Sequence, residues 1–176
     1  MKTWWKPSLS QLSPEPTAAC AAPVSGAVDA HVHVFPPEII GDRDSYLGKD
    51  ARFDELYASP QARMATAEEV VAQMDERGTG MSVVFGFAFT DVGLCKAAND
   101  YVMGAVQKYP DRLAGLACVP WGSPDAASEL ERCLDAGLRG CGELAPRSGD
   151  SEEIARIGAV AAVLRERGLP LMVHAS

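Results

Sequence analysis

Two histidines at positions 31 and 33 are the residues whose type and spacing best suit chemistry. His31 and His33 lie two positions apart in an apolar run, so on a β-strand both side chains leave the same face. Their Cα atoms would lie roughly 6–7 Å apart at a rise of about 3.3 Å per residue. Two imidazoles at that separation can bind one metal ion. The alternative is a pair of half-buried histidines bonded to backbone carbonyls.

Two further residues extend this candidate metal site. His174 is the only other histidine of the sequence, and it ends a later predicted strand. Glu143 lies near the end of another strand, where a carboxylate is costly to bury alone. A metal ion or a salt bridge to Arg139 or Arg147 would offset that cost, and the sequence supports both equally. Asp29 shares the parity of the histidines and could orient an imidazole, although a structural bond near the start of the strand is the favoured interpretation.

Strands and helices alternate from residue 27 onward, and they must position these side chains. The predicted strands are 27–34, 81–87, 113–119, 138–144 and 170–174. The predicted helices begin at a Thr66–Glu69 capping box, within 94–106, at Ser123-Pro124 and at Ser151. Strands that are apolar on both faces, separated by amphipathic helices, are typical of parallel β/α units. The charged residues Arg52 and Arg63 fall in the long connection 38–65 and are interpreted as solvated.

The choice of fold lies between an open doubly wound sheet and a (β/α) barrel. No G-x-G-x-x-G follows the first strand, which disfavours a dinucleotide-binding sheet. We therefore predict an α/β fold, a parallel (β/α) barrel that is incomplete, with about five of eight units, because a whole barrel typically needs about 250 residues. The strand ends meet on the active face of a barrel, so His31, His33 and His174 would converge there.

The composition of the chain indicates which classes of partner and which compartment to expect. The 176 residues carry 24 acidic and 16 basic side chains, a net charge of −8. Such a surface argues against nucleic acid or a membrane as a primary partner. Five cysteines without a C-x-x-C pair indicate a reduced compartment, and we expect the cytoplasm. Residues 1–26 are predicted to be a poorly ordered leader, and 27–176 the N-terminal part of one (β/α)8 domain.

The segment 28–36, VDAHVHVFP, resembles the opening signature of the amidohydrolase superfamily. It is most similar to the amidohydrolase-related group that includes aminocarboxymuconate-semialdehyde decarboxylase-like proteins. The other segments that resemble this group are 66–78, 82–86, 129–144 and 169–176. The resemblance implies a distorted barrel of the metal-dependent hydrolase type with one or two divalent ions, often zinc. The implied ligands match His31, His33 and His174, and Glu143 is similar to a strand-four glutamate that some members use.

The resemblance implies a metal-dependent hydrolase whose activated water attacks a C–N, C–O or similar bond of a small molecule. One alternative is a metal-dependent non-oxidative decarboxylase acting on a carboxylate. Another is an inactive half-barrel that binds a complementing chain or a second copy of itself. Family members use a strand-eight aspartate as ligand and base, and many use a strand-six histidine. Neither occurs here, so we expect a truncated enzyme whose catalytic residues are unassigned.

Overall fold

The computed structural model describes residues 26–145 and 151–174. Except for Gly26, the predicted leader lies outside the described residues, as does Arg147. The strands are β1 (Ala27–His33), β2 (Thr79–Phe85), β3 (Leu113–Gly115), β4 (Cys141–Leu144) and β5 (Leu171–Val173). The helices are α1 (Pro37–Gly41), the 3₁₀-helix η2 (Arg43–Ser45), α2 (Ala51–Tyr57), α3 (Ala67–Arg77), α4 (Val92–Lys108), α5 (Ala126–Asp135) and α6 (Ser151–Arg167).

All described strand pairs are parallel. β1, β2 and β3 form one sheet in chain order, and β4 pairs with β5 in a second. A single parallel bridge between Ala117 and Cys141 links the two sheets. The strands therefore follow one another in space as they do in sequence, and their C-terminal ends lie on the same side. The predicted parallel α/β fold is confirmed.

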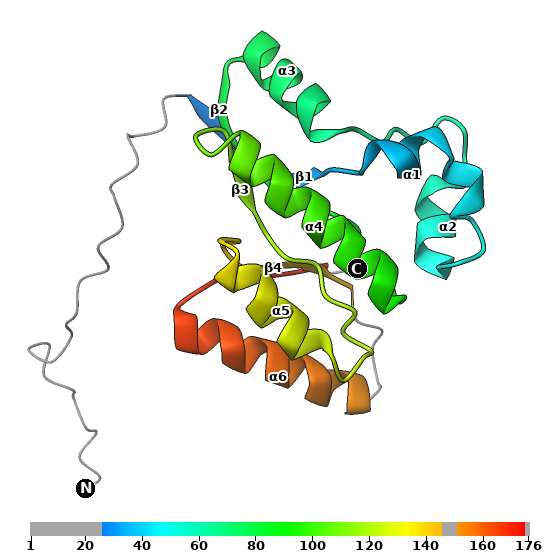
Figure 1. Cartoon of the computed structure of the whole chain (residues 1–176), viewed down its shortest axis with the longest axis vertical. Coiled ribbons are helices and arrows are strands. Elements are labelled where there is room, and N and C mark those ends of the chain that lie inside the picture. The colour runs from blue at the N-terminus through cyan, green and yellow to red at the C-terminus, as the bar shows by residue number, and fades with distance from the viewer. Residues whose placement is uncertain (1–25, 146–150, 175–176) are drawn as a thin grey trace, which may run out of the picture.

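Helices α3 and α4 cover the first sheet, and α5 packs on α6 beside the second (Figure 1). Helix α3 begins as predicted: Thr66 Oγ1 accepts from the Glu69 amide at 3.2 Å, and the Glu69 carboxylate accepts from the Thr66 amide at 2.8 Å. It ends at Gly78 in the left-handed conformation, with φ of 70°. Its buried stripe of Val70 and Met74 joins the main core.

The connection 38–65 is more regular than the sequence suggested. It contains α1, η2 and α2, which are short and offer little periodicity. Helix α2 has a clear local cause, because Asp50 caps it by accepting from the amides of Arg52 and Phe53, both at 3.0 Å. Phe53 is fully buried in a second core, which contains Phe35, Phe85, Phe87 and Phe89.

Several predicted element boundaries are wrong. The second strand, expected over 81–87, runs over Thr79–Phe85, and the fourth, expected over 138–144, begins at Cys141. The third strand, expected over 113–119, ends at Gly115, and at Cys118 the backbone bonds to the side chain of Asn99 instead of to a neighbouring strand. The helix expected to begin at Ser123-Pro124 begins at Ala126. There, the Ser123 hydroxyl accepts from the Asp125 amide at 3.1 Å and forms a turn before the helix.

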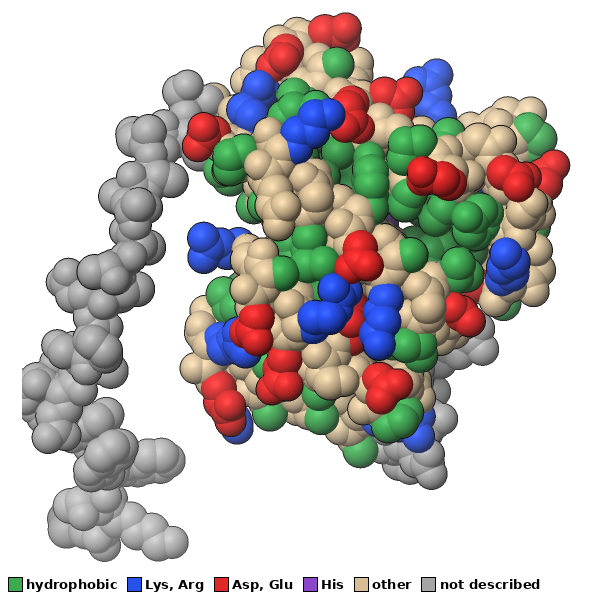
Figure 2. All heavy atoms as spheres, viewed as in Figure 1, with side chains coloured by type: hydrophobic (Ala, Val, Ile, Leu, Met, Phe, Trp, Pro, Cys, Tyr) green, Lys and Arg blue, Asp and Glu red, His purple; other side chains and the backbone are tan. Residues whose placement is uncertain are grey.

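The surface carries both signs of charge. Acidic and basic side chains are interspersed over the face shown in Figure 2, so the net charge of −8 is not gathered into one patch on this face. Within the described residues, none of the helices has the length and apolarity needed to cross a bilayer.

Candidate metal centre

Strand β1 presents both histidines of the H-x-H pair on the same face, as its parity requires. The ring centroids of His31 and His33 lie 5.4 Å apart. Phe85 at the end of β2 packs edge-on against both rings, at 5.0 Å and 4.6 Å. His33 Nδ1 lies 2.9 Å from the Gly86 carbonyl oxygen and donates to it, which leaves Nε2 as the acceptor. That tautomer is the one a metal-binding imidazole uses.

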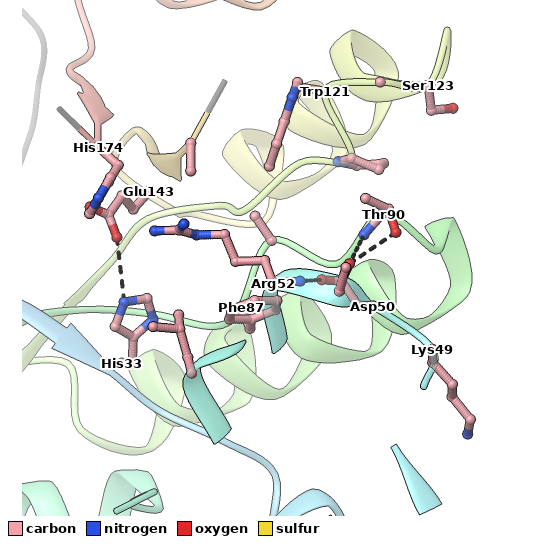
Figure 3. A pocket seen from close by; sticks show the side chains of 16 residues that line it. His33, Lys49, Asp50, Arg52, Phe87, Thr90, Trp121, Ser123, Glu143 and His174 are labelled. Carbon is pink, nitrogen blue, oxygen red and sulfur yellow. Dashed lines mark hydrogen bonds and ion pairs between the residues drawn. The ribbon is translucent and has the colours of Figure 1, made fainter. Parts of the chain in front are cut away.

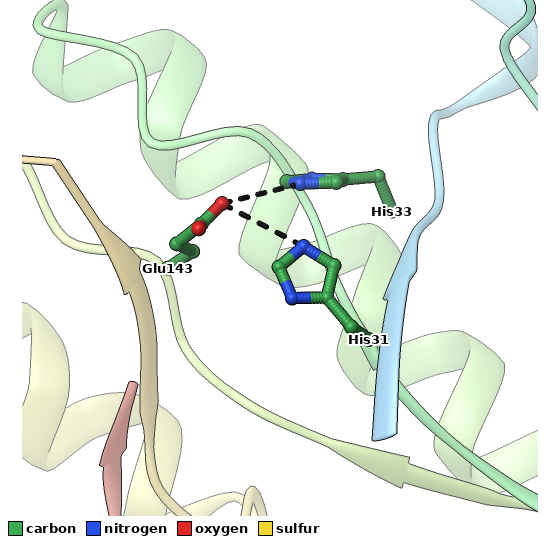
Figure 4. A group of neighbouring side chains, drawn as sticks. All are labelled: His31, His33 and Glu143. Carbon is green, nitrogen blue, oxygen red and sulfur yellow. Dashed lines mark ion pairs between the residues drawn. The ribbon is translucent and has the colours of Figure 1, made fainter. Parts of the chain in front are cut away.

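Glu143 on β4 faces the two histidines across the end of the sheet (Figure 4). Its Oε2 atom lies 3.6 Å from His33 Nε2 and 3.7 Å from His31 Nε2. Donor atoms bound at 2.0–2.2 Å in a tetrahedral shell lie roughly 3.3–3.6 Å from one another. The donor atoms of the three residues all fall within 4.8 Å, the only such group in the part of the chain that the structure describes. This donor set fits a divalent ion.

His174 approaches the opposite side of the same carboxylate. It directly follows β5, where its amide donates to the Leu144 carbonyl at 2.7 Å. Its Nδ1 atom lies 2.9 Å from Glu143 Oε1. His174 therefore joins the cluster through Glu143 and is not a member of the group within 4.8 Å. The four predicted residues come together, while the assignment of each as a ligand stays a prediction.

The sequence left two alternatives open at this site. Arg139 makes no ion pair with Glu143 within residues 26–145 and 151–174; its backbone amide donates to the Gly115 carbonyl at 2.7 Å. Asp29 accepts from the backbone amide of His31 at 3.2 Å, so the interpretation of Asp29 as a structural residue is confirmed.

The protonation state of His33 suits metal binding. Burial lowers the pKa of His33, and the neighbouring His31 lowers it further, so the ring stays neutral around pH 7. A neutral imidazole is the form that binds a metal. Burial raises the pKa of the Cys118 thiol well above its ordinary value, so this sulfur keeps its proton in the metal-free protein, and it lies outside the group of donor atoms within 4.8 Å.

A cavity of about 820 Å³ opens beside the cluster. Glu143, His33 and His174 lie at one end of it, and Trp121 lies on another wall (Figure 3). Arg52 extends from the first turn of α2 towards the histidine end. Sequence reasoning interprets Arg52 only as a solvated loop charge. The cap at Asp50 is the signal that places it at the start of a helix beside the cavity. The other lining residues include Lys49, Asp50, Leu56, Phe87, Thr90 and Pro120.

Asp50 fastens α2 to the opposite wall of the cavity. Its Oδ2 accepts from both the amide and the hydroxyl of Thr90, each at 2.9 Å, while Oδ1 caps α2. Burial alone would raise the pKa of this carboxyl, but the hydrogen bonds from Thr90, Phe53 and Arg52 prevail and lower it. The position of Arg52 in the cavity therefore depends on a carboxylate that remains ionised at neutral pH.

The parallel strands carry a histidine–carboxylate cluster at their C-terminal ends, an arrangement that fits a divalent-metal site. Residues 28–176 match the amidohydrolase family model, and the chain belongs to the amidohydrolase family. A search among curated proteins gave no match.

Solved structures support the same fold. The 5-carboxyvanillate decarboxylase of Novosphingobium aromaticivorans, with bound manganese, matches at a TM-score of 0.67 and 23% identity over 84% of this chain and 50% of that one. The dihydroxybenzoic acid decarboxylase of Polaromonas sp. JS666, also with manganese, gives 0.58 and 22% over 86% and 49%. A protein of Acinetobacter baumannii described as a probable 2-pyrone-4,6-dicarboxylic acid hydrolase gives 0.52 and 19% over 85% and 49%. The chain spans about half the length of these structures.

Proposed function

We propose that this chain carries the metal site of a divalent-metal-dependent hydrolase that acts on a small molecule. The observation that carries the proposal is the approach of His31, His33 and Glu143, whose donor atoms lie within 4.8 Å of one another. We also propose that the five strands belong to a (β/α) barrel with this site on its C-terminal rim. The parallel strand order and the amidohydrolase-like structures support that architecture.

A bound divalent ion supplies Lewis-acid polarisation and lowers the pKa of water towards 7. The residues of this chain perform the remaining tasks. The bond from His33 Nδ1 to the Gly86 carbonyl aims Nε2 at the site. The Glu143 carboxylate offsets part of the charge of a cation, and His174 holds that carboxylate by one oxygen. Trp121 and Phe87 line the cavity and reduce the access of bulk water to a substrate within it.

The identity of the ion belongs to the proposal. Imidazole ligands suit zinc, which the family resemblance suggests, while carboxylate ligands also suit manganese. Two of the similar solved structures contain manganese. We therefore propose a divalent ion bound by His31, His33 and Glu143, with His174 as a further ligand or as the group that orients Glu143, and test both metals.

A non-oxidative decarboxylase is the second candidate. Two cationic side chains, Arg52 and Lys49, line the same cavity as the metal cluster. A guanidinium binds a carboxylate through two parallel hydrogen bonds, so this wall favours an anionic substrate. The decarboxylases among the similar structures act on aromatic acids, which fit the same description. A decarboxylase would replace the carboxylate of such an acid with a proton and release carbon dioxide.

The experiment that tests the proposal separates the two reactions. Metal-free protein is reconstituted with Zn²⁺ or Mn²⁺ and offered a panel of small esters, amides, lactones and hydroxybenzoates. Mass spectrometry follows hydrolysis, and a coupled bicarbonate assay follows carbon dioxide. We expect metal-dependent hydrolysis that is lost in His33→Ala and kept in Glu131→Gln, an exposed carboxylate on α5. Carbon dioxide release without hydrolysis would favour the second candidate, and turnover that survives both chelation and His33→Ala contradicts both.

A further inference from the structure

A single buried side chain contacts two backbone carbonyl groups beside the metal cluster. Cys118 is fully buried in the segment after β3. Its Sγ atom lies 2.9 Å from the Gly142 carbonyl oxygen and 3.5 Å from the Gly86 carbonyl oxygen. Gly142 directly precedes Glu143, and the Gly86 carbonyl is the group that accepts from His33 Nδ1. The thiol therefore contacts both the carbonyl that orients His33 on β1 and the carbonyl that directly precedes Glu143 on β4.

The Gly142 carbonyl lies where strand pairing is irregular. β4 pairs with β5 at Cys141 and at Leu144, and the register shifts between them. The Gly142 amide donates to the Ala117 carbonyl at 2.9 Å, and its carbonyl accepts from the Cys118 thiol. Both polar groups of Gly142 are therefore bonded to two consecutive residues of the segment after β3. These bonds hold the backbone immediately before Glu143, from which the Glu143 side chain projects.

Asn99 on α4 in turn fixes Cys118. Its Oδ1 accepts from the Cys118 amide at 2.9 Å, and its Nδ2 donates to the Cys118 carbonyl at 2.7 Å. Nδ2 also donates to Glu129 Oε1 at 2.8 Å, and a carboxylate can only accept, which fixes the orientation of the amide. Arg132 bonds both oxygens of Glu129 at 2.8 Å. No hydrogen-bonding atom of the Asn99 amide turns away from this network, and Asn99 is fully buried.

We propose that Cys118 and Asn99 are positioning residues of the metal centre, with the Asn99-held thiol setting the separation of His33 and Glu143. The inference rests on the proposed function, because it concerns the same ion. Groups that hold metal ligands in place typically change metal affinity by about 10–100-fold when they are replaced. Binding sites also require their donors within about 0.5 Å of the productive geometry. A network with only a structural role would affect stability and leave the affinity unchanged.

The test compares Mn²⁺ dissociation constants, measured by calorimetry well below the unfolding temperature. Cys118→Ala, which removes the donor, should raise the constant about 10–100-fold. Cys118→Ser, which keeps a donor, should lie closer to the wild type. Should Cys118→Ala fail to fold, Cys118→Val fills the space without donating and takes its place. The matched control is Val102→Ala, because Val102 on α4 is as fully buried as Cys118; this change should lower the melting temperature and leave the constant unchanged.

A second readout needs no metal. Nitrogen-15 chemical shifts of the His33 ring report its tautomer and its bond to Gly86. We expect them to move in metal-free Cys118→Ala and to stay in Val102→Ala. A Cys118→Ala protein that binds Mn²⁺ like the wild type, with unmoved His33 shifts, would overturn the inference alone. A wild-type protein that binds neither Mn²⁺ nor Zn²⁺ would overturn the proposed function as well, so the two failures are distinguishable.

Discussion

Replacing Asp50 with alanine should lower the free energy of unfolding by about 2–4 kcal/mol. This value comes from the four hydrogen bonds that the carboxylate accepts, two at the start of α2 and two from Thr90, all at 2.9–3.0 Å. Loss of a helix cap costs about 1 kcal/mol. Each bond to a charged acceptor contributes roughly 1.5–3 kcal/mol, and bonds that share one carboxylate are not additive. Asp50 is 5% exposed, so water replaces few of these bonds.

Urea denaturation followed by circular dichroism measures this loss. Asp44→Ala is the control, because Asp44 is an exposed aspartate in the neighbouring helix η2 and a surface change there stays within about 0.5 kcal/mol. Asp50→Ala also releases α2 from Thr90, so the affinity of the cavity for a carboxylate ligand should fall together with the stability. An Asp50→Ala protein as stable as Asp44→Ala would refute the reasoning that this carboxylate fastens α2 to the cavity wall.

Three further predictions concern the same framework. The pKa of Asp50 is lowered in the folded state, so its contribution to stability is present above the unfolded value of about 3.9 and is lost as the pH falls through the folded value. The gap in unfolding free energy between wild type and Asp50→Asn should therefore narrow below about pH 4 in acid-titrated urea curves; a constant gap would contradict it. Phe53→Ala should cost about 3–5 kcal/mol in the same assay, because the ring is fully buried between Phe87 and Phe89, and a loss below 1 kcal/mol would be inconsistent with that packing. Thr66→Ala should cost about 1 kcal/mol and lower the melting temperature by a few degrees, and an unchanged temperature would argue against the capping box.

The features that the sequence predicted correctly are those with a local cause. The parity of β1 places His31 and His33 on one face, whatever the rest of the fold. The strand ends at Glu143 and His174 follow from apolar runs with clear boundaries, and parallel strands bring such ends to one edge. The capping box at Thr66 is complete within four residues. Each prediction depended on a short segment and one geometric rule.

The features that the sequence did not predict depend on contacts between distant segments. The cavity wall at Arg52 requires Asp50 to meet Thr90, which lies 40 residues away. The backbone of Cys118 bonds to the side chain of Asn99 on α4, and nothing in residues 113–119 indicates this contact. In the sequence, Asn99 only interrupts the apolar positions of its helix. That its amide bonds the backbone of Cys118, as a neighbouring strand would, is seen only in the folded structure.

The measurement that tests the central claim most directly is a calorimetric titration of metal-free protein with Mn²⁺ and Zn²⁺. The account predicts saturable binding to the wild type and a dissociation constant at least about tenfold higher in His31→Ala, His33→Ala and Glu143→Gln. Glu131→Gln should bind like the wild type. Absence of binding, or histidine variants with an unchanged constant, would contradict the assignment of this cluster as a metal centre.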